Sequence, residues 1–321
     1  MPAAIVPRPA HLPALLTADL DAANSYALAD KSEATRRAYR SDWTAFEAYC
    51  RLHGQAPLPA TPGLVAAFVS GEARRGLSAS SIARRVAAIR YAHLLAKHET
   101  PTESEAVKSV VRGIRRTIGT APARKAAATA DVVSKMLDAE TWPSGLRGQR
   151  DRALVLLAFA GALRRSEVCA LQVADLTETA DGFRVLIRHS KGDQQSAGQE
   201  IAVPRGTKLR PVEAVRAWLD AARITEGPVF RPINRGGRVV DAMLTAESVA
   251  EIIKDAAGRV GLDPAMFAGH SLRRGFLTSA ANSGASIFKM ADQSRHKSLE
   301  TLRGYVVDAE RFKDHAGADF L

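Results

Sequence analysis

Apolar residues recur at helical spacing in the first third of the chain. The clearest repeat follows Ser32, where Tyr39, Trp43, Phe46 and Cys50 stand four, three and four residues apart. This spacing places the four side chains on one face of a helix, and Ser32 can cap the first turn. We therefore predict an amphipathic helix whose apolar face packs into a core.

Three further helical patterns occur before residue 118. A weak pattern covers 18–29, another follows the prolines of 57–62 and ends near Gly76, and the last starts at 78–81. On this last helix one apolar face is formed by Ile82, Val86, Ile89 and His93. The patterns predict a helical N-terminal domain.

The pattern changes in the middle of the chain. Residues 117–130 lack large apolar side chains and contain Pro, Gly and three consecutive alanines, which is typical of an interdomain linker. An apolar helix over 151–163 follows, and 164–171 continues or restarts it. Alternating residues from Phe183 to Ile187 then predict a strand, and a second strand over 200–203 returns after a polar turn.

Helical patterns over 212–222, 246–260 and 272–283 complete the second half. The predicted fold class is mainly α with a small antiparallel sheet, in which a helical N-terminal domain precedes an α+β domain. We divide the chain into a mobile tail at 1–16, a helical domain at 17–117, a linker at 118–130 and a second domain at 131–321. Two domains suit a chain of 321 residues.

Positive charge is concentrated in one part of the sequence. The formal net charge is +11, and the segment from Gly71 to Lys125 holds 12 basic residues against 4 acidic ones. Such an excess favours a polyanionic partner such as nucleic acid. A basic solvated surface without a partner, or a compositional bias, would produce the same count.

Several classes of protein are disfavoured by the composition. The longest nearly apolar stretch, 153–163, is shorter than the roughly 20 residues of a membrane span, and prolines interrupt the N-terminal segment where a signal peptide would be apolar. Cys50 and Cys169 offer neither a disulfide framework nor metal-ligand spacing. We expect a cytoplasmic protein without a membrane partner, cofactor or metal.

Candidate catalytic residues are weak signals when each is taken alone. His270 and Arg273 share a helix face at i and i+3, as ordinary surface residues also do. Arg164 and Glu167 have the same spacing and would form a simple helical ion pair. Three further candidates also have ordinary structural explanations. Lys191 could be a solvated lysine in a turn, His296 an exposed histidine and Tyr305 a core tyrosine.

The order and context of these residues are more informative. FAGALRRSEVCAL, AGHSLRRGFLTSAANSGASIFKMADQSRH and the segment from His296 to Tyr305 resemble the arginine, HxxR and nucleophile motifs of the tyrosine recombinase (phage integrase) family. Upstream, SEATRRAYRSDWTAFEAYC and the segment that begins GLSASSIARR resemble the core-binding domain of the phage recombinase Cre. The resemblance covers nearly the whole chain. One position departs from the family pattern, because Arg295 stands where a glycine commonly precedes the histidine.

The resemblance implies a site-specific DNA recombinase that cleaves and rejoins strands through a 3′-phosphotyrosyl intermediate and a Holliday junction. It implies Tyr305 as the nucleophile and Lys191 as the general acid that protonates the leaving 5′ oxygen. His270 would act as a base or orienting group, and Glu167 would support the residues that contact the phosphate. The phosphate itself would receive positive charge and hydrogen bonds from Arg164, Arg273 and His296.

The resemblance also implies a clamp of two domains around double-stranded DNA with a specific inverted-repeat site. A dimer on each site would form a homotetramer, and the tail after Tyr305 would dock on a neighbouring protomer. The helix after Ser32 and the helix that starts at 78–81 also carry arginines outside their apolar faces. We expect these arginines to contact DNA grooves and phosphates; they are Arg36, Arg37, Arg40, Arg84 and Arg85. Two alternatives stay open: a type IB topoisomerase, which uses nearly the same residues on one duplex, and a catalytically silent DNA-binding protein.

Overall fold

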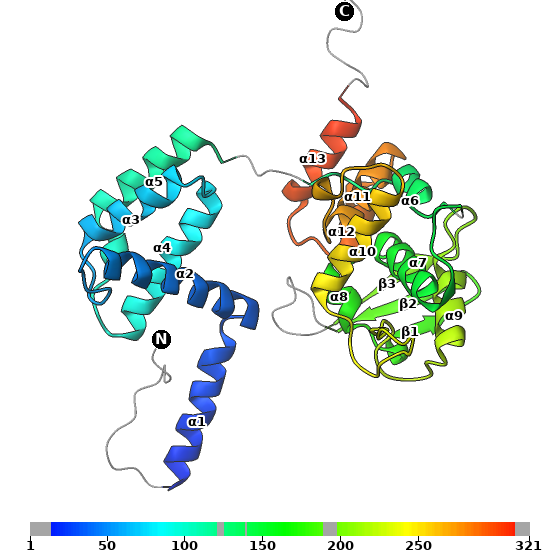
Figure 1. Cartoon of the computed structure of the whole chain (residues 1–321), viewed down its shortest axis with the longest axis horizontal. Coiled ribbons are helices and arrows are strands. Elements are labelled where there is room, and N and C mark those ends of the chain that lie inside the picture. The colour runs from blue at the N-terminus through cyan, green and yellow to red at the C-terminus, as the bar shows by residue number, and fades with distance from the viewer. Residues whose placement is uncertain (1–13, 121–124, 139, 189–197, 312–321) are drawn as a thin grey trace, which may run out of the picture. The chain divides into compact units, whose positions relative to one another are not determined.

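The computed structural model describes residues 14–120, 125–138, 140–188 and 198–311 (Figure 1). The chain divides into two compact units, Met1–Ala123 and Arg124–Leu321, and this division falls within the predicted linker. The described part of the first unit contains helices, whereas the second combines helices with a small sheet (Figure 1). The predicted fold class is confirmed. Within the described ranges, no helix has both the length and the apolar character that crossing a membrane requires.

The first unit is a helical bundle built around the predicted amphipathic helix. Trp43, Phe46 and Cys50 are buried there, as their spacing predicted, and the Ser32 hydroxyl accepts a hydrogen bond from the Thr35 N–H. The first helix begins at Ala14 rather than in the predicted range. The helices of this unit are α1 (Ala14–Ala29), α2 (Glu33–Leu52), α3 (Pro62–Arg74), α4 (Ala79–Leu95), a 3₁₀ turn (Pro101–Glu103) and α5 (Glu105–Ile118).

Helix α5 was not predicted from the sequence as a helix of its own. Its N-terminus is capped by the Ser104 hydroxyl, which accepts from the Val107 N–H, and Val107 itself is buried. Val110, Val111 and Ile114 are partly buried against the core, and Ile118 is exposed. Val107, Val110, Val111, Ile114 and Ile118 nevertheless recur at helical spacing, so the amphipathic pattern of this helix is present in the sequence although the helix was not predicted.

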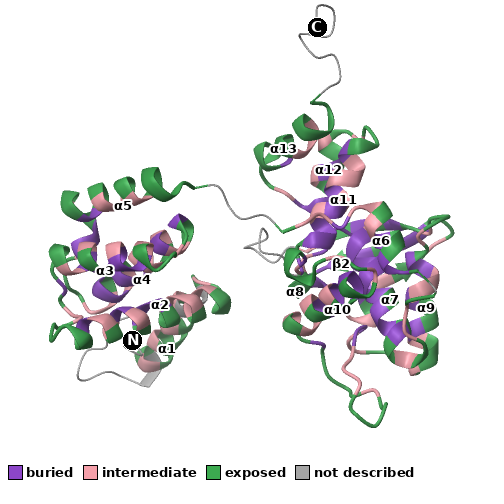
Figure 2. Ribbon diagram, turned by 45° about the horizontal axis from the view of Figure 1, so that its top comes forward, coloured by how far each residue is buried: buried purple, intermediate pink, exposed green. Residues whose placement is uncertain are grey.

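The second unit is organised around α7 (Gly145–Ala160), in which every residue from Ala153 to Phe159 is buried (Figure 2). Helices that are apolar on all sides belong in the centre of a domain, and α9 and α11 pack on this one. The remaining helices are α6 (Ala130–Met136), α8 (Arg165–Ala170), α9 (Pro211–Ala222), α10 (Ala246–Arg259), α11 (Ser271–Asn282), α12 (Ile287–Ser294) and α13 (Leu299–Ala309), with 3₁₀ turns at Val173–Asp175 and Pro264–Met266.

The sheet is antiparallel, with strand order β1-β2-β3. Phe183 pairs with Val203 and Val185 with Ile201, and these residues face the core while Arg184 and Leu186 are exposed. The predicted alternation and the returning strand are therefore confirmed. The sheet also contains a third, three-residue strand, too short to show a pattern. The strands are β1 (Leu176–Glu178), β2 (Gly182–Ile187) and β3 (Gln199–Pro204).

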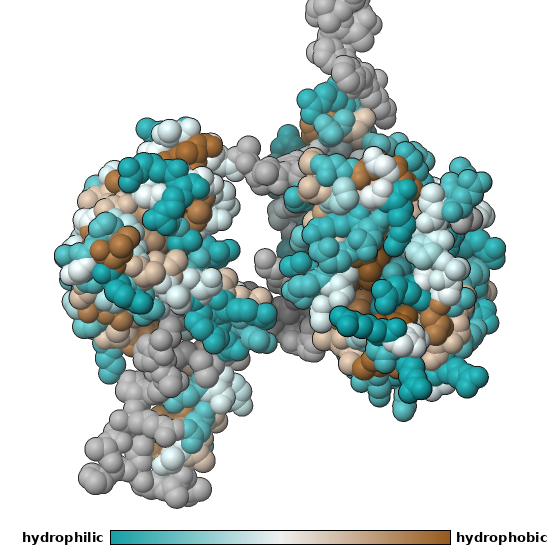
Figure 3. All heavy atoms as spheres, in the orientation of Figure 1, coloured by the Kyte–Doolittle hydropathy of each residue, from teal (hydrophilic) through white to brown (hydrophobic). Residues whose placement is uncertain are grey.

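The end of the predicted linker packs on the second unit. The Ala128 N–H donates to the Ser271 carbonyl at 3.0 Å, the Ala130 N–H donates to the Ser279 hydroxyl at 2.9 Å, and Ala128 is fully buried. Small residues are needed here because the backbone passes directly over α11. The faces of both units seen in Figure 3 are mostly hydrophilic, with apolar side chains in scattered patches.

Candidate active site

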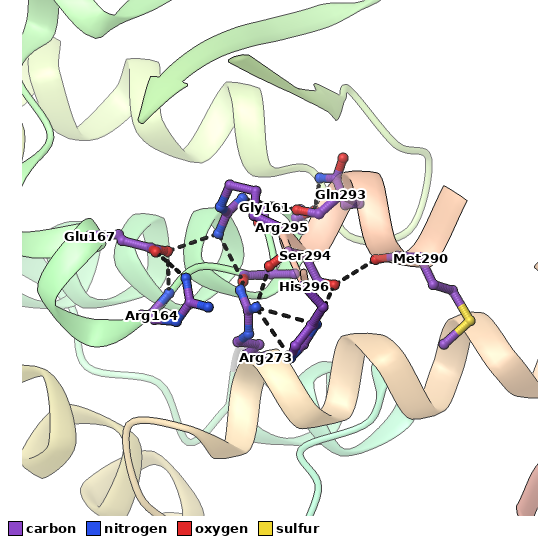
Figure 4. Close-up of polar contacts among 11 residues, drawn as sticks. Gly161, Arg164, Glu167, Arg273, Met290, Gln293, Ser294, Arg295 and His296 are labelled. Atoms are coloured by element: carbon purple, nitrogen blue, oxygen red, sulfur yellow. Dashed lines mark hydrogen bonds and ion pairs between the residues drawn. The ribbon is translucent and has the colours of Figure 1, made fainter. Parts of the chain in front are cut away.

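The site forms where the loop after α7, the start of α8, α11 and the end of α12 meet (Figure 4). Arg164 is the N-cap residue of α8, and Glu167 occupies the third position of that helix. One Glu167 carboxylate oxygen, Oε2, accepts from the Arg164 backbone N–H at 2.8 Å, and Oε1 accepts from Arg164 Nη1 at 2.5 Å. Glu167 is buried, so the pair is a fixed part of the structure rather than a mobile surface ion pair.

Arg273 projects from α11 into the same place and is 4% exposed. Its Nη1 donates to the Ala162 carbonyl at 2.6 Å, and its Nη2 donates to the Ser294 carbonyl. Burial, followed by the charges of Arg164 and Arg295, lowers the Arg273 pKa to about 9. This guanidinium is therefore surrounded by like charge, a favourable arrangement for an anionic ligand.

His296 follows α12 and is held by Ser294. The Ser294 hydroxyl donates its proton to the Met290 carbonyl at 2.6 Å, so at 2.7 Å from His296 Nδ1 it accepts a hydrogen bond from the ring. This assigns the proton of the neutral ring to Nδ1. Burial and then the charges of Arg273, Arg164 and Arg295 lower the His296 pKa to about 4.

The structure brings Arg164, Glu167, Arg273 and His296 together. Tyr305 is half-buried on α13, packed against the small cluster that contains Leu302, and it acts electrostatically on Arg273.

His270 is exposed at the N-cap of α11, so it precedes the helix on which it was predicted to lie. Lys191 falls outside the described residues. Within the described ranges, no group of three or more His, Cys, Asp or Glu residues has the arrangement of a metal site.

Arg295 also belongs to the site, although the sequence did not predict it as a site residue. Its backbone has a φ of 57°, in the left-handed region where glycine is favoured, and this agrees with the glycine commonly found there. Its side chain is buried and its Nη2 donates to Glu167 Oε2 at 2.8 Å. The departure from the family pattern was visible in the sequence, but the partner of the arginine was not.

The candidate DNA-contacting arginines of the first unit differ in their surroundings. Arg84 is 50% exposed and forms two hydrogen bonds with the buried Asp42 carboxylate, at 2.7 and 3.2 Å. Arg85 is only 16% exposed and pairs with the buried Glu72 at 2.5 Å. Arg37 and Arg40 are exposed on α2, and Arg36 is half-buried there. Arg85 thus joins α4 to α3, whereas Arg37, Arg40 and Arg84 are exposed to solvent.

Comparison with known proteins identifies the family of the chain. The model of the phage integrase family matches residues 127–311, and that of the phage integrase N-terminal SAM-like domain matches residues 25–100. The chain therefore belongs to the phage integrase family of tyrosine recombinases.

Among its relatives is an integrase/recombinase XerD homologue of Selenomonas ruminantium, 38% identical over 294 residues, which are 89% of this chain and 85% of the relative. A tyrosine recombinase XerC of Xanthomonas campestris is 30% identical and covers 84% of this chain and 77% of the relative.

Solved structures share the fold at lower identity. XerH recombinase in a post-cleavage complex with a palindromic difH substrate has a TM-score of 0.63 at 16% identity, over 88% of this chain and 79% of that one. A lambda integrase dimer bound to a COC′ core site has a TM-score of 0.61 at 19% identity, over 95% of this chain and 84% of that one. The particular resemblance to Cre stays a prediction.

Proposed function

We propose that this protein is a site-specific DNA recombinase that cleaves and rejoins strands through a covalent bond between Tyr305 and a 3′ phosphate. One observation carries the proposal: Arg164, Arg273 and His296 converge from three separate segments around one buried carboxylate, Glu167. A cluster of guanidinium groups around one buried carboxylate, as in the described part of the site, is suited to a phosphate and to the negative charge that develops during its transfer.

The roles of the residues follow from this electrostatic arrangement. Arg164 and Arg273 would bind the non-bridging oxygens of the scissile phosphate. A tyrosine hydroxyl is a weak acid, so Tyr305 needs a cationic surrounding or a base to become a nucleophile, and His270 is the candidate base or orienting group. Lys191 is the proposed general acid for the leaving 5′ oxygen.

His296 would act after the phosphate arrives. In the free site the ring is neutral, with its proton on Nδ1 and an unprotonated Nε2 within 3.5 Å of Arg273 Nη2. A bound phosphate anion adds negative charge and so raises the pKa of the ring. Protonated Nε2 then donates a hydrogen bond to the phosphate, and Nδ1 keeps its bond to Ser294.

The covalent intermediate makes rejoining independent of an external energy source. Cleavage replaces the bond from phosphorus to the 5′ oxygen by one to the Tyr305 oxygen, so the number of phosphoester bonds is unchanged. Attack by the 5′ hydroxyl of another strand reverses the exchange and releases Tyr305. We propose that the reaction uses neither ATP nor a metal ion.

The proposed substrate is duplex DNA with a specific, inverted-repeat site. The XerH and lambda integrase structures contain DNA, a palindromic substrate in the first and a protein dimer on a core site in the second. We propose a dimer on each site and a homotetramer on two paired sites, which exchange strands through a Holliday junction. Arg36, Arg37, Arg40 and Arg84 are proposed to contact this DNA, whereas the contacts of Arg85 favour a structural role.

The decisive experiment uses a nicked duplex that carries the site, located first by footprinting of the bound DNA. The nick traps the intermediate, and a denaturing gel should reveal a protein–DNA adduct that is absent with Tyr305→Phe. No adduct on any bound DNA would favour a silent binding protein. Relaxation of plasmids without strand exchange between specific sites would favour a type IB topoisomerase.

A further inference from the structure

Arg295 links two parts of the site that are far apart in the sequence. It ends α12 immediately before His296, and its side chain, 1% exposed, reaches Glu167, which lies 128 residues earlier in the chain. A glycine would adopt the observed φ of 57° without strain. The side chain is therefore present despite the backbone conformation and not because of it.

The guanidinium of Arg295 is bound on several sides. Nη1 donates to the Gln293 carbonyl at 2.9 Å and to the Gly161 carbonyl at 3.3 Å. Nη2 donates to the Ala162 carbonyl at 3.3 Å as well as to Glu167. Figure 4 shows the Arg295 side chain lying between the Glu167 carboxylate and the end of α12. The loop after α7, the start of α8 and the end of α12 are fixed to one another by this one group.

These contacts bear directly on the two arginines proposed to bind phosphate. Arg295 holds Glu167 Oε2, and this fixes the plane of the carboxylate whose other oxygen orients Arg164. The Ala162 carbonyl accepts hydrogen bonds from both Arg295 and Arg273. Because Arg295 is itself buried, it acts on the substrate only through these neighbours.

We propose that Arg295 is a positioning residue for strand cleavage, which holds Glu167, and through it Arg164, in the geometry that the scissile phosphate requires. The inference rests on the proposed function, because it refines the cleavage step. The three guanidinium groups around one carboxylate also leave excess positive charge for an anionic transition state. After burial and the charges of Arg273 and Arg164, the charge of Arg295 also lowers the pKa of His296.

The test compares Arg295→Met and Arg295→Lys with a matched control, Arg150→Met. Arg150 is likewise buried in the second unit, with a side chain 9% exposed and paired at 2.7 Å with Asp151. Its hydrogen bonds go to Asp151 and the Arg231 carbonyl and not to any described residue of the site. Single-turnover cleavage of the nicked duplex at saturating protein, the Kd for that DNA and an NMR titration of the His296 ring without DNA are measured for each variant.

We expect Arg295→Met to cleave at least 100-fold more slowly than wild type while its Kd stays within about threefold, because the lost contacts orient groups that act in the transition state. The pKa of His296 should rise from about 4 toward its ordinary value. Arg150→Met should lower the melting temperature, yet leave the cleavage rate of the folded protein and the His296 pKa unchanged.

Arg295→Lys keeps the charge and provides a variant that folds if the methionine variant does not. A lysine ammonium cannot reproduce the spread of contacts made by the guanidinium, so we expect cleavage at least tenfold slower than wild type with a His296 pKa that stays low. Wild-type cleavage by either Arg295 variant, or losses equal to those of Arg150→Met, would overturn the inference. Absence of an adduct with the wild-type protein would instead defeat the proposed function.

Discussion

Two residues of the site have backbone conformations that side chains disfavour. Within the described ranges, four non-glycine residues have positive φ, and two of them are Ala162, at 46°, and Arg295, at 57°. The left-handed region costs such a residue about 1–2 kcal/mol, and strain of this kind persists where surrounding contacts impose it. Here the Ala162 carbonyl is bound by two buried guanidinium groups. The same hydrogen bonds that orient the arginines therefore also hold the strained loop.

The buried histidine of the first unit, His93, is expected to make the stability of that unit dependent on pH. His93 is fully buried in α4; its Nε2 accepts from the Ala60 N–H at 2.9 Å, so its Nδ1 carries the proton and donates to the Ile89 carbonyl at 2.9 Å. Burial is the main cause that lowers its pKa, and the nearby His98 lowers it further. Protonation of Nε2 would remove its bond to Ala60.

The sign of the effect follows from this lowered pKa. The folded state binds a proton less readily than the unfolded state, so the stabilisation is present above the unfolded pKa of about 6.5 and is lost as the pH falls below it. We expect the melting temperature of the first unit, followed by Trp43 fluorescence, to fall between pH 7 and pH 5. His93→Gln can donate and accept in the same places without titrating, and it should weaken this dependence. An unchanged pH profile in that variant would contradict the assignment.

The residues of the candidate active site could be predicted only in part from the sequence. Arg164, Glu167, Arg273 and His296 were identified by the order of family motifs, since each alone had an ordinary structural explanation. The acceptors that position them, such as the carbonyls of Gly161 and Ala162, are backbone groups that every residue carries. Their alignment depends on a left-handed turn and on tertiary packing, which spacing in the sequence does not encode.

At the scale of elements, predictability followed the strength of local signals. The helix after Ser32 and the strand from Phe183 to Ile187 have a strong apolar period, and both were predicted. Strand β1, with three residues, is too short to show a period and was not predicted. Helix α5 is an exception, because Val107, Val110 and Ile114 recur at helical spacing and yet the helix was not predicted. The segment 126–130 has the alanine-rich composition of a linker, yet the same small residues let it lie against α11. Small residues are thus ambiguous: they are typical of linkers and of close packing.

Because this segment crosses closely over α11, we expect a glycine of that helix to tolerate no larger side chain. A Cβ added at Gly275 would lie 1.7 Å from the Ala128 carbonyl oxygen, far inside any permitted contact. Gly275→Ala must displace the segment or the helix, and we expect it to destabilise the second unit by about 3 kcal/mol or more. Thermal and denaturant unfolding of the full chain measure the change.

Gly304 provides the matched control, because it lies in α13 of the same unit and an added Cβ there has no atom within 4 Å. Gly304→Ala should be neutral or stabilise the unit by up to about 1 kcal/mol through helix propensity. Equal stability of Gly275→Ala and Gly304→Ala would show that the crossing is not as close as described.

At the scale of the whole molecule, the basic segment and the proposed catalytic residues lie in different units. The proposed catalytic groups lie in the second unit, whereas the basic segment from Gly71 to Lys125 lies almost entirely in the first. Phosphate contacts provide much of the affinity for DNA and little of its sequence specificity. We therefore expect substitutions in the first unit to change affinity and its salt dependence more than the rate of cleavage by bound protein.

Arg40 allows this expectation to be tested, since it is exposed on α2. If it contacts one phosphate, Arg40→Ala should weaken binding of specific and unrelated duplexes to a similar degree and reduce the slope of log Kd against log salt by about 0.9. Arg235→Ala, which removes an exposed arginine of the second unit outside the basic segment, is the control for loss of net charge alone. The slope is informative because it counts released counterions, whereas a change in Kd alone also includes any disturbance of the fold. If both variants change the slope equally, the affinity reflects the overall charge of the protein rather than contacts made by α2.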